Sequence, residues 1–173
     1  AEMIGQTDYL DKDRAIEHWK ARGLDFTKLL HKPTPEKGVS IYNNEAQDHG
    51  LEHVLDRKFI ELAKPALDAK KPVKAELAIT NVNRSAGAML SGEVAKRYGH
   101  AGLPEDTIFF TLNGTAGQAF GAWVAAGVTL DLVGEGNAYG GKGLSGRKLI
   151  ERPKPTSGIT PEAFTNGSSP TPV

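Results

Sequence analysis

The sequence predicts a mainly β protein, a parallel β-helix with glycine-rich corners that short α-helices precede. Two observations predict this fold. Fourteen of the 20 glycines lie between positions 87 and 146, and residues 107–152 overlay themselves when the segment is shifted by 20 residues. A repeat of this length, with alternating apolar residues and glycine corners, is typical of a solenoid whose coils bury their inner faces against one another.

The repeat aligns residues of the same kind, with Thr111 and Asp131 at a shared outward polar position. The aligned pairs are Ile108 with Val128, Phe110 with Leu130, Leu112 with Leu132, Gly114 with Gly134, Gly121 with Gly141, and Val124 with Leu144. A third copy begins with Ile150 aligned with Leu130, although Lys148 and Arg152 disturb its register. We therefore expect strands near 107–112, 118–124, 128–133 and 147–152.

The corners of the coils are expected to depend on glycine, which permits a positive φ and a close approach of two backbones. We assign a structural turn role to seven glycines: Gly114, Gly117, Gly121, Gly134, Gly141, Gly143 and Gly146. The aromatic rings of Phe120 and Trp123 are expected in the solenoid core or on a coil face.

Composition divides the chain into three regions. Residues 1–47 are expected to form a helical arm or linker, with a helix over 11–22. Residues 48–153 form the β-helix domain, which we expect to be truncated. Residues 154–173 are rich in Pro, Ser, Thr and Gly, and we expect this tail to be disordered or to have been added for expression.

The start of the β-helix domain carries conventional helix and strand signals. Residues 48–71 predict two short helices, with Asp48 as the N-cap and a break at Pro65, which lacks an N–H for the helix ladder. Residues 73–79 alternate as a half-buried strand does. Residues 89–98 predict a helix that ends at Gly99.

Charge and composition exclude several classes of protein. Lys+Arg and Asp+Glu both number 21, so the chain lacks the basic character that phosphate binding requires, and we expect no nucleic-acid partner. No apolar run is long enough to span a membrane, so we expect no membrane contact. Cysteine is absent, which excludes disulfides, thiolate metal sites, Fe–S ligation and a cysteine nucleophile within this chain.

One segment, Gly141-Lys142-Gly143-Leu144-Ser145-Gly146, matches the GxGxxG pattern. A dinucleotide site needs a helix after these glycines, so that the pyrophosphate can lie at the helix N-terminus. The residues that follow are β-like and soon reach Pro153. The pattern is therefore interpreted as a coil corner, with Lys142 solvated rather than bound to an anion.

Three other clusters could carry chemistry. His49 and His53 are spaced i,i+4 in a predicted helix and could share a metal, but no third ligand is evident and a structural role is favoured. Residues 81–85, Asn-Val-Asn-Arg-Ser, follow a strand and are interpreted as turn formers rather than as a ligand site. An Asp48–His53–Ser91 triad is rejected because no nucleophile elbow frames a serine. We assign no catalytic, cofactor-binding or metal-binding residue.

Several segments together resemble the C-terminal region of the large (α) subunit of glutamate synthase. The likeness runs in order over roughly residues 1–153 and includes the following segments: Glu2-Met3-Ile4-Gly5, His18-Trp19-Lys20, Gln47-Asp48-His49-Gly50-Leu51, residues 60–66, residues 81–84, residues 89–99, residues 102–107, Ala116-Gly117-Gln118, residues 127–130 and residues 141–146. In that family this region is the GXGXG domain, so the resemblance implies a right-handed β-helix.

The resemblance implies a non-catalytic structural domain of an oxidoreductase that makes two glutamates from glutamine, 2-oxoglutarate and a reductant, in a cytoplasmic NADPH-type enzyme. The parent enzyme implies FMN and a 3Fe–4S cluster elsewhere in its large chain, with FAD and 4Fe–4S clusters on the partner subunit. The implied partners are the FMN synthase and glutaminase domains of the same parent chain and the small NADPH-oxidising subunit.

The sequence also departs from the family pattern. Gly134-Glu135-Gly136-Asn137-Ala138-Tyr139 stands where the family has an aspartate-containing loop, and Arg147 replaces a glycine. Two alternatives to the glutamate synthase reading stay open. One is an interaction subunit of another GXGXG-containing oxidoreductase or amidotransferase complex, and the other is a stand-alone nucleotide- or anion-binding module that uses residues 140–146.

Overall fold

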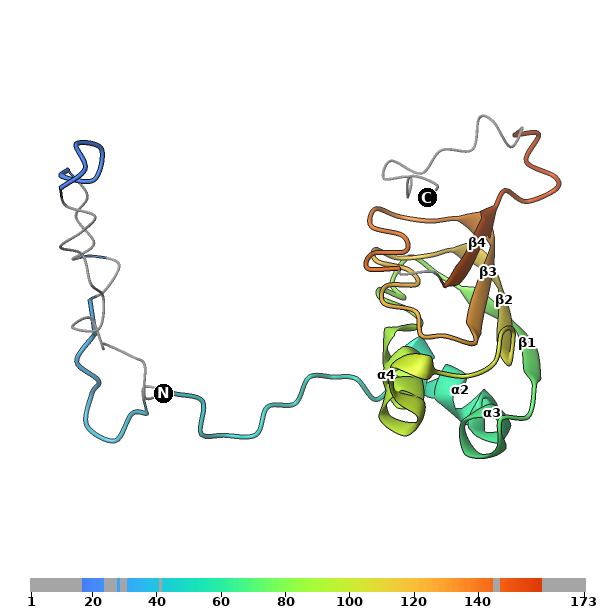
Figure 1. Cartoon of the computed structure of the whole chain (residues 1–173), viewed down its shortest axis with the longest axis horizontal. Helices are drawn as coiled ribbons and strands as arrows, with labels where there is room; N and C mark the ends of the chain where they lie inside the picture. The colour runs from blue at the N-terminus through green and yellow to red at the C-terminus, as the bar shows by residue number, and fades with distance from the viewer. Residues whose placement is uncertain (1–16, 24–27, 29–30, 41, 145–146, 160–173) are drawn as a thin grey trace. The chain divides into compact units, whose positions relative to one another are not determined.

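The computed structural model describes residues 17–23, 28, 31–40, 42–144 and 147–159 (Figure 1). The chain divides into two compact units, Ala1–His49 and Gly50–Val173. In the first unit, residues 17–23 form turns and a bend. The helix predicted over 11–22 is therefore absent from residues 17–22, and its first part, 11–16, lies outside the described residues.

Two short helices begin the second unit. Helix α2 spans Leu55–Leu62 and helix α3 spans Lys64–Ala69, with Pro65 in the first turn of α3. The prediction of two helices with a break near Pro65 is confirmed. The predicted N-cap is wrong, because Val54 rather than Asp48 precedes the first turn of α2. Gly50 has a positive φ of 62°, and the chain at 48–53 is irregular.

Four parallel strands form one sheet in the order β1-β2-β3-β4. Their bounds are β1 Val73–Ile79, β2 Ile108–Thr115, β3 Val128–Glu135 and β4 Lys148–Arg152. Helix α4, Ala88–Tyr98, and the short 3₁₀ helix η2, Gly99–Ala101, lie between β1 and β2 in sequence. Figure 1 shows α2, α3 and α4 gathered at the β1 end of the sheet. The observed architecture is a mixture of helix and parallel sheet.

The 20-residue repeat has the predicted register between β2 and β3. Ile108 pairs with Val128, Phe110 with Leu130, Leu112 with Leu132, and Gly114 with Gly134. Strand β1 belongs to the same ladder, because Val73 pairs with Ile108. The 20-residue repeat does not extend back to β1, because α4 lengthens the connection between β1 and β2 and hides the spacing.

The predicted register of the third copy is wrong by one residue. Leu149, not Ile150, pairs with Leu130. A shift of one residue moves every side chain to the opposite face of a strand. The shift places Lys148, Ile150 and Arg152 on the outer face, which removes the conflict that Lys148 and Arg152 created in the predicted register. It also places Glu151 opposite Leu132, on the inner face.

The strand predicted over 118–124 is also wrong, because residues 119–123 form turns. Ala119, Gly121 and Trp123 have positive φ values of 59°, 63° and 54°, which an extended strand does not permit. Alternate residues Phe120, Ala122 and Val124 are nevertheless buried. The period-two pattern arises here from a corner loop that turns at every second residue.

The core lies on the inner face of the sheet and beneath α2–α4. The rings of Phe59 of α2 and Phe110 of β2 have centroids 5.1 Å apart, which joins helices and sheet in one apolar cluster. Phe120 is fully buried, whereas Trp123 is 59% exposed. Among the described residues, no helix has the length and hydropathy needed to cross a bilayer.

Candidate functional site

We call the connections that follow β1, β2 and β3 the first, second and third corner loops. Their described residues are 80–87, 116–127, and 136–144 with 147, and their backbones are stacked. Gly117 N donates to Asn83 O at 3.2 Å, and Gly121 N donates to Ala86 O at 3.0 Å, which joins the first loop to the second. Gly141 N donates to Phe120 O at 2.8 Å, which joins the third loop to the second. The loop amides are thus used to hold the loops together.

Two glycines near the ends of β2 and β3 meet the backbone of the neighbouring strand so closely that no side chain fits. Gly114 and Gly134 have φ values of 140° and 152°. A Cβ on Gly134 would lie 1.8 Å from Gly114 O, and a Cβ on Gly114 would lie 2.0 Å from Ile79 O. Gly121, Gly141 and Gly143 also have positive φ, a Cβ on Gly117 would lie 2.6 Å from Asn81 O, and Gly146 lies outside the described residues.

The GxGxxG segment does not have the geometry of a dinucleotide site. The next regular element after it is β4, not a helix. The amides of Lys142 and Leu144 donate to Tyr139 O at 3.2 Å and to Gly141 O at 2.9 Å. Lys142 Nζ lies 5.7 Å from the ring centroids of both Trp123 and Tyr139. Among the described residues of this region, 141–144 and 147–152, the chain turns and then enters β4, so no helix N-terminus follows the glycines to meet a pyrophosphate.

The polar cluster at residues 81–85 builds the first corner loop. Asn83 Oδ1 accepts hydrogen bonds from Thr80 N at 2.8 Å and from Thr80 Oγ1 at 3.0 Å. Arg84 Nη2 donates to Gln118 Oε1 at 2.6 Å, and Asn137 Nδ2 donates to Asn81 Oδ1, so side chains also tie the three loops to one another.

His49 and His53 do not form the predicted helical pair. Both lie before α2 in the irregular segment, and both are exposed. Within residues 17–23, 28, 31–40, 42–144 and 147–159, no group of three or more His, Cys, Asp or Glu side chains is arranged to hold a metal. The hydroxyl of Ser91 donates to Gly87 O at 2.7 Å and accepts from Ala125 N at 3.1 Å, so it links α4 to the second corner loop.

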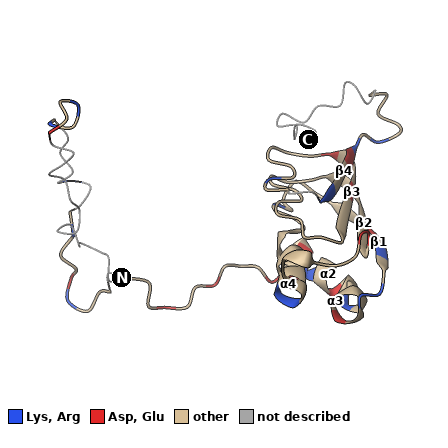
Figure 2. Cartoon of the chain, in the orientation of Figure 1, with Lys and Arg blue, Asp and Glu red and all other residues tan. Residues whose placement is uncertain are grey.

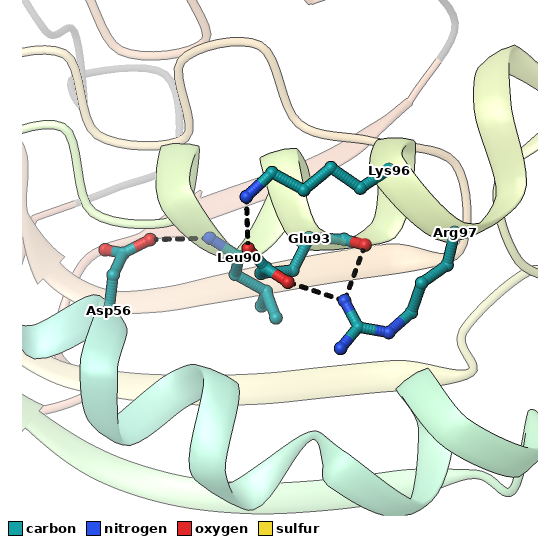
Figure 3. A network of polar contacts seen from close by, with 5 residues as sticks. All are labelled: Asp56, Leu90, Glu93, Lys96 and Arg97. Atoms are coloured by element: carbon teal, nitrogen blue, oxygen red, sulfur yellow. Dashed lines mark hydrogen bonds and ion pairs between the residues drawn. The ribbon is translucent and has the colours of Figure 1, made fainter.

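Asp56 is a buried carboxylate that caps a distant helix, a role that the sequence reasoning missed. Its side chain, only 4% exposed, accepts hydrogen bonds from Gly87 N at 2.9 Å and from Leu90 N at 3.0 Å, at the start of α4 (Figure 3). Burial raises the pKa of Asp56, and the amides of Leu90, Gly87 and Met89 oppose that rise. The carboxylate replaces the side-chain cap that α4 itself lacks.

Other ion pairs lie on surfaces of the second unit. Glu93 of α4 pairs with Lys96 at 2.7 Å and with Arg97 at 2.5 Å, and these hydrogen bonds lower the pKa of Glu93 (Figure 3). On the outer face of the sheet, Arg152 Nε donates to Asp131 Oδ1 at 2.9 Å and Arg152 Nη2 donates to Asp131 Oδ2 at 2.8 Å. These pairs join residues of neighbouring turns and strands, so each has a structural use.

A groove of about 360 Å³ lies between α4 and the second corner loop, and we call it the α4 groove. Small side chains at successive turns of α4 form one wall: Ala88, Ser91, Gly92 and Ala95. Residues 123–126 form the opposite wall, and His100, Gly143 and Arg147 also line the groove. Figure 2 shows charged residues gathered on the helices, whereas the corner loops carry few.

Comparison with known proteins identifies the family. Residues 56–166 match the family model described as the GXGXG motif. The chain belongs to the GXGXG motif family. It is homologous to the C-terminal region of the glutamate synthase large chain.

Three relatives illustrate the range of this homology. The chain is 45% identical over 151 residues to the large chain of the NADPH glutamate synthase of Bacillus subtilis, a match that covers 86% of this chain and 10% of the relative. It is 44% identical over 162 residues to the NADH glutamate synthase of Schizosaccharomyces pombe, covering 93% of this chain and 8% of the relative. It is 34% identical over 165 residues to the ferredoxin-dependent glutamate synthase 2 of Synechocystis, covering 93% and 10%. The chain therefore spans about a tenth of the length of these relatives.

Proposed function

We propose that this chain is a non-catalytic packing domain of a glutamate synthase, in which it supports the parts that convert glutamine, 2-oxoglutarate and reductant into two glutamates. One observation carries the proposal. Homology covers most of this chain but only about a tenth of each relative, so the remaining nine-tenths of such a protein is available for catalysis. The partners are then the synthase and glutaminase parts of that protein and its reductant-oxidising subunit.

The finer organisation is part of the same proposal. Residues 1–47 act as an arm, residues 48–153 form right-handed β-helix coils, and residues 154–173 are a tail. The corner glycines serve as turns rather than as ligand contacts, since several loop amides are already donated to neighbouring carbonyls. We assign the protein to the cytoplasm, by analogy with the family.

The cofactors of such an enzyme do not fit the residues of this chain. A 3Fe–4S cluster requires thiolate ligands, and the sequence contains no cysteine. FMN has a phosphate, but the glycine segment of this chain leads into β4 instead of a helix N-terminus. The cluster and FMN therefore belong to other parts of the parent enzyme.

Activity assays test this proposal directly. The purified 173-residue chain is expected to show no glutamine hydrolysis and no 2-oxoglutarate-dependent oxidation of NADPH. Turnover above a heat-denatured control in either assay would contradict the proposal. Millimolar NAD(P), FAD or FMN is expected to leave the thermal unfolding midpoint unchanged, and a rise would favour a nucleotide-binding module instead, because a ligand of the native state must stabilise it.

A further inference from the structure

The fold does not explain why a tryptophan stands at position 123. Its φ of 54° lies in the left-handed region, which is unfavourable for a bulky residue, and its side chain is 59% exposed. The position 20 residues later holds Gly143, with a φ of 69°. The corner therefore needs a residue with positive φ but does not need an indole, and core packing gives no reason for one.

The indole is nevertheless held in a defined place. A Cβ on Gly143 would lie 2.5 Å from Cδ1 and 2.6 Å from Nε1 of Trp123, so one side of the ring rests on the backbone of the third corner loop. The ring also forms part of the α4 groove, opposite the small side chains of the helix. A strained, exposed and positioned aromatic side chain is typical of a binding surface.

The charge around the α4 groove has one sign. Lys142 Nζ lies 5.7 Å from the ring centroids of Trp123 and Tyr139, and Arg147 lines the groove. Arg147 Nη2 donates to His100 O at 3.3 Å. No carboxylate is among the described residues that line the groove. The nearest acid in sequence on α4, Glu93, is paired with Lys96 and Arg97.

We infer that the α4 groove binds an acidic peptide segment that inserts one large apolar side chain beside Trp123, and that this segment belongs to the rest of the glutamate synthase large chain. The small residues of α4 admit the inserted side chain, and Lys142 and Arg147 attract the flanking carboxylates. The source follows from the proposed function, on which this inference rests, because the chain spans about a tenth of its relatives.

Peptide binding tests the inference. Overlapping synthetic peptides covering the rest of the Bacillus subtilis large chain would be titrated into the full chain carrying Trp19→Phe, in which Trp123 is the remaining tryptophan. We expect peptides with an apolar residue between carboxylates to shift the emission of Trp123 to the blue and to reduce its quenching by acrylamide. Replacing their carboxylates by amides should weaken binding, as should high salt.

Two variants and a control distinguish binding at the α4 groove from nonspecific binding. Peptide affinity is measured by the fluorescence anisotropy of labelled peptides. Trp123→Gly copies the residue at Gly143, which keeps the corner conformation, and should weaken binding at least about tenfold. Lys142→Glu should weaken binding of acidic peptides similarly. Val82→Ser, at another corner where the side chain is 82% exposed, should leave affinity unchanged.

Three results would overturn the inference: no peptide binds, bound peptides are not acidic, or Trp123→Gly binds as the parent chain does. None of these results bears on catalysis, so the proposed function would stand if the activity assays remain negative. Conversely, glutaminase or NADPH-oxidising turnover by the chain would overturn the proposed function whatever the peptides do.

Discussion

The two complete copies of the repeat, residues 108–127 and 128–147, have the same backbone register but different outer surfaces. At inward positions the copies carry similar apolar residues, as at the pair Phe110 and Leu130. In the corner loops, Ala119 corresponds to Tyr139 and Trp123 to Gly143, 20 residues apart, and these four residues share positive φ. The comparison shows that stacking requires apolar side chains at the inward positions and positive φ at the turns. The outward side chains are not constrained by stacking, so they can contribute to binding.

The largest expected effect comes from the glycine that both copies carry near the end of their strand, Gly114 in β2 and Gly134 in β3. In Gly134→Ala, the new Cβ would overlap Gly114 O at 1.8 Å, and the contact is backbone, so no side-chain movement relieves it. We expect a loss of at least about 3 kcal/mol in the free energy of unfolding, or failure to fold. Urea denaturation followed by circular dichroism measures it.

A glycine outside the corners provides the control for that substitution. Gly92 lies inside α4, where a Cβ would meet nothing within 4 Å. Gly92→Ala should raise stability by about 0.5–1 kcal/mol, because alanine is the better helix former. If both variants lose stability equally, the account of Gly134 is wrong.

The next effect distinguishes inner from outer positions of the paired strands. Leu130 is fully buried, so Leu130→Ala should cost about 2–5 kcal/mol through lost burial and a cavity. Thr111, on the outer face of β2, is half-buried, and Thr111→Ala should cost less than about 1 kcal/mol. Equal losses in thermal or urea denaturation would contradict the assignment of faces.

The sequence predicted the parts of the fold where chemistry repeats. The register of β2 and β3 could be read because residues 108–114 and 128–134 alternate alike. The turn over 119–123 could not, because alternate burial is common to a strand and to a corner with positive φ at every second residue. The sequence repeat did not reveal β1 as part of the same ladder, because α4 is inserted after it.

The candidate site was less predictable than the fold. The α4 groove joins residues 88–95 to residues 123–126, which only the folded chain brings together. In the sequence alone, the small side chains of α4 do not indicate that the helix forms one wall of a groove. The capping role of Asp56 was missed for the same reason, since its acceptor contacts are with amides 31 and 34 residues away. The one sequence signal that pointed to the groove was Trp123, which aligns with a glycine in the next copy of the repeat.

A smaller effect concerns the cap that joins α2 to α4. Asp56→Asn replaces one carboxylate oxygen, which now accepts from backbone N–H, by an amide donor. We expect a loss of about 1–3 kcal/mol in the free energy of unfolding at neutral pH. Lys58→Gln, at an exposed position of the same helix, should change stability by less than about 0.5 kcal/mol.

The pH dependence of that loss has a defined sign. Because the pKa of Asp56 is raised in the folded chain, its protonation contributes stability that is present below the ordinary carboxyl pKa and is lost as pH rises through the raised value. Asparagine cannot titrate. The deficit of Asp56→Asn relative to the parent chain should therefore be larger near the ordinary carboxyl pKa than at pH 7, and a deficit that grows toward pH 7 would show the opposite sign.

Among the residues that the account assigns a role, the smallest stability effect is expected at Trp123, whose counterpart in the next copy is Gly143. Parallel measurements of unfolding free energy and of acidic-peptide affinity on Trp123→Gly test the separation of folding and binding residues most directly. The account predicts stability within about 1 kcal/mol of the parent chain, because strain relief offsets lost ring contacts, together with at least about tenfold weaker binding. A large loss of stability with binding retained would contradict it.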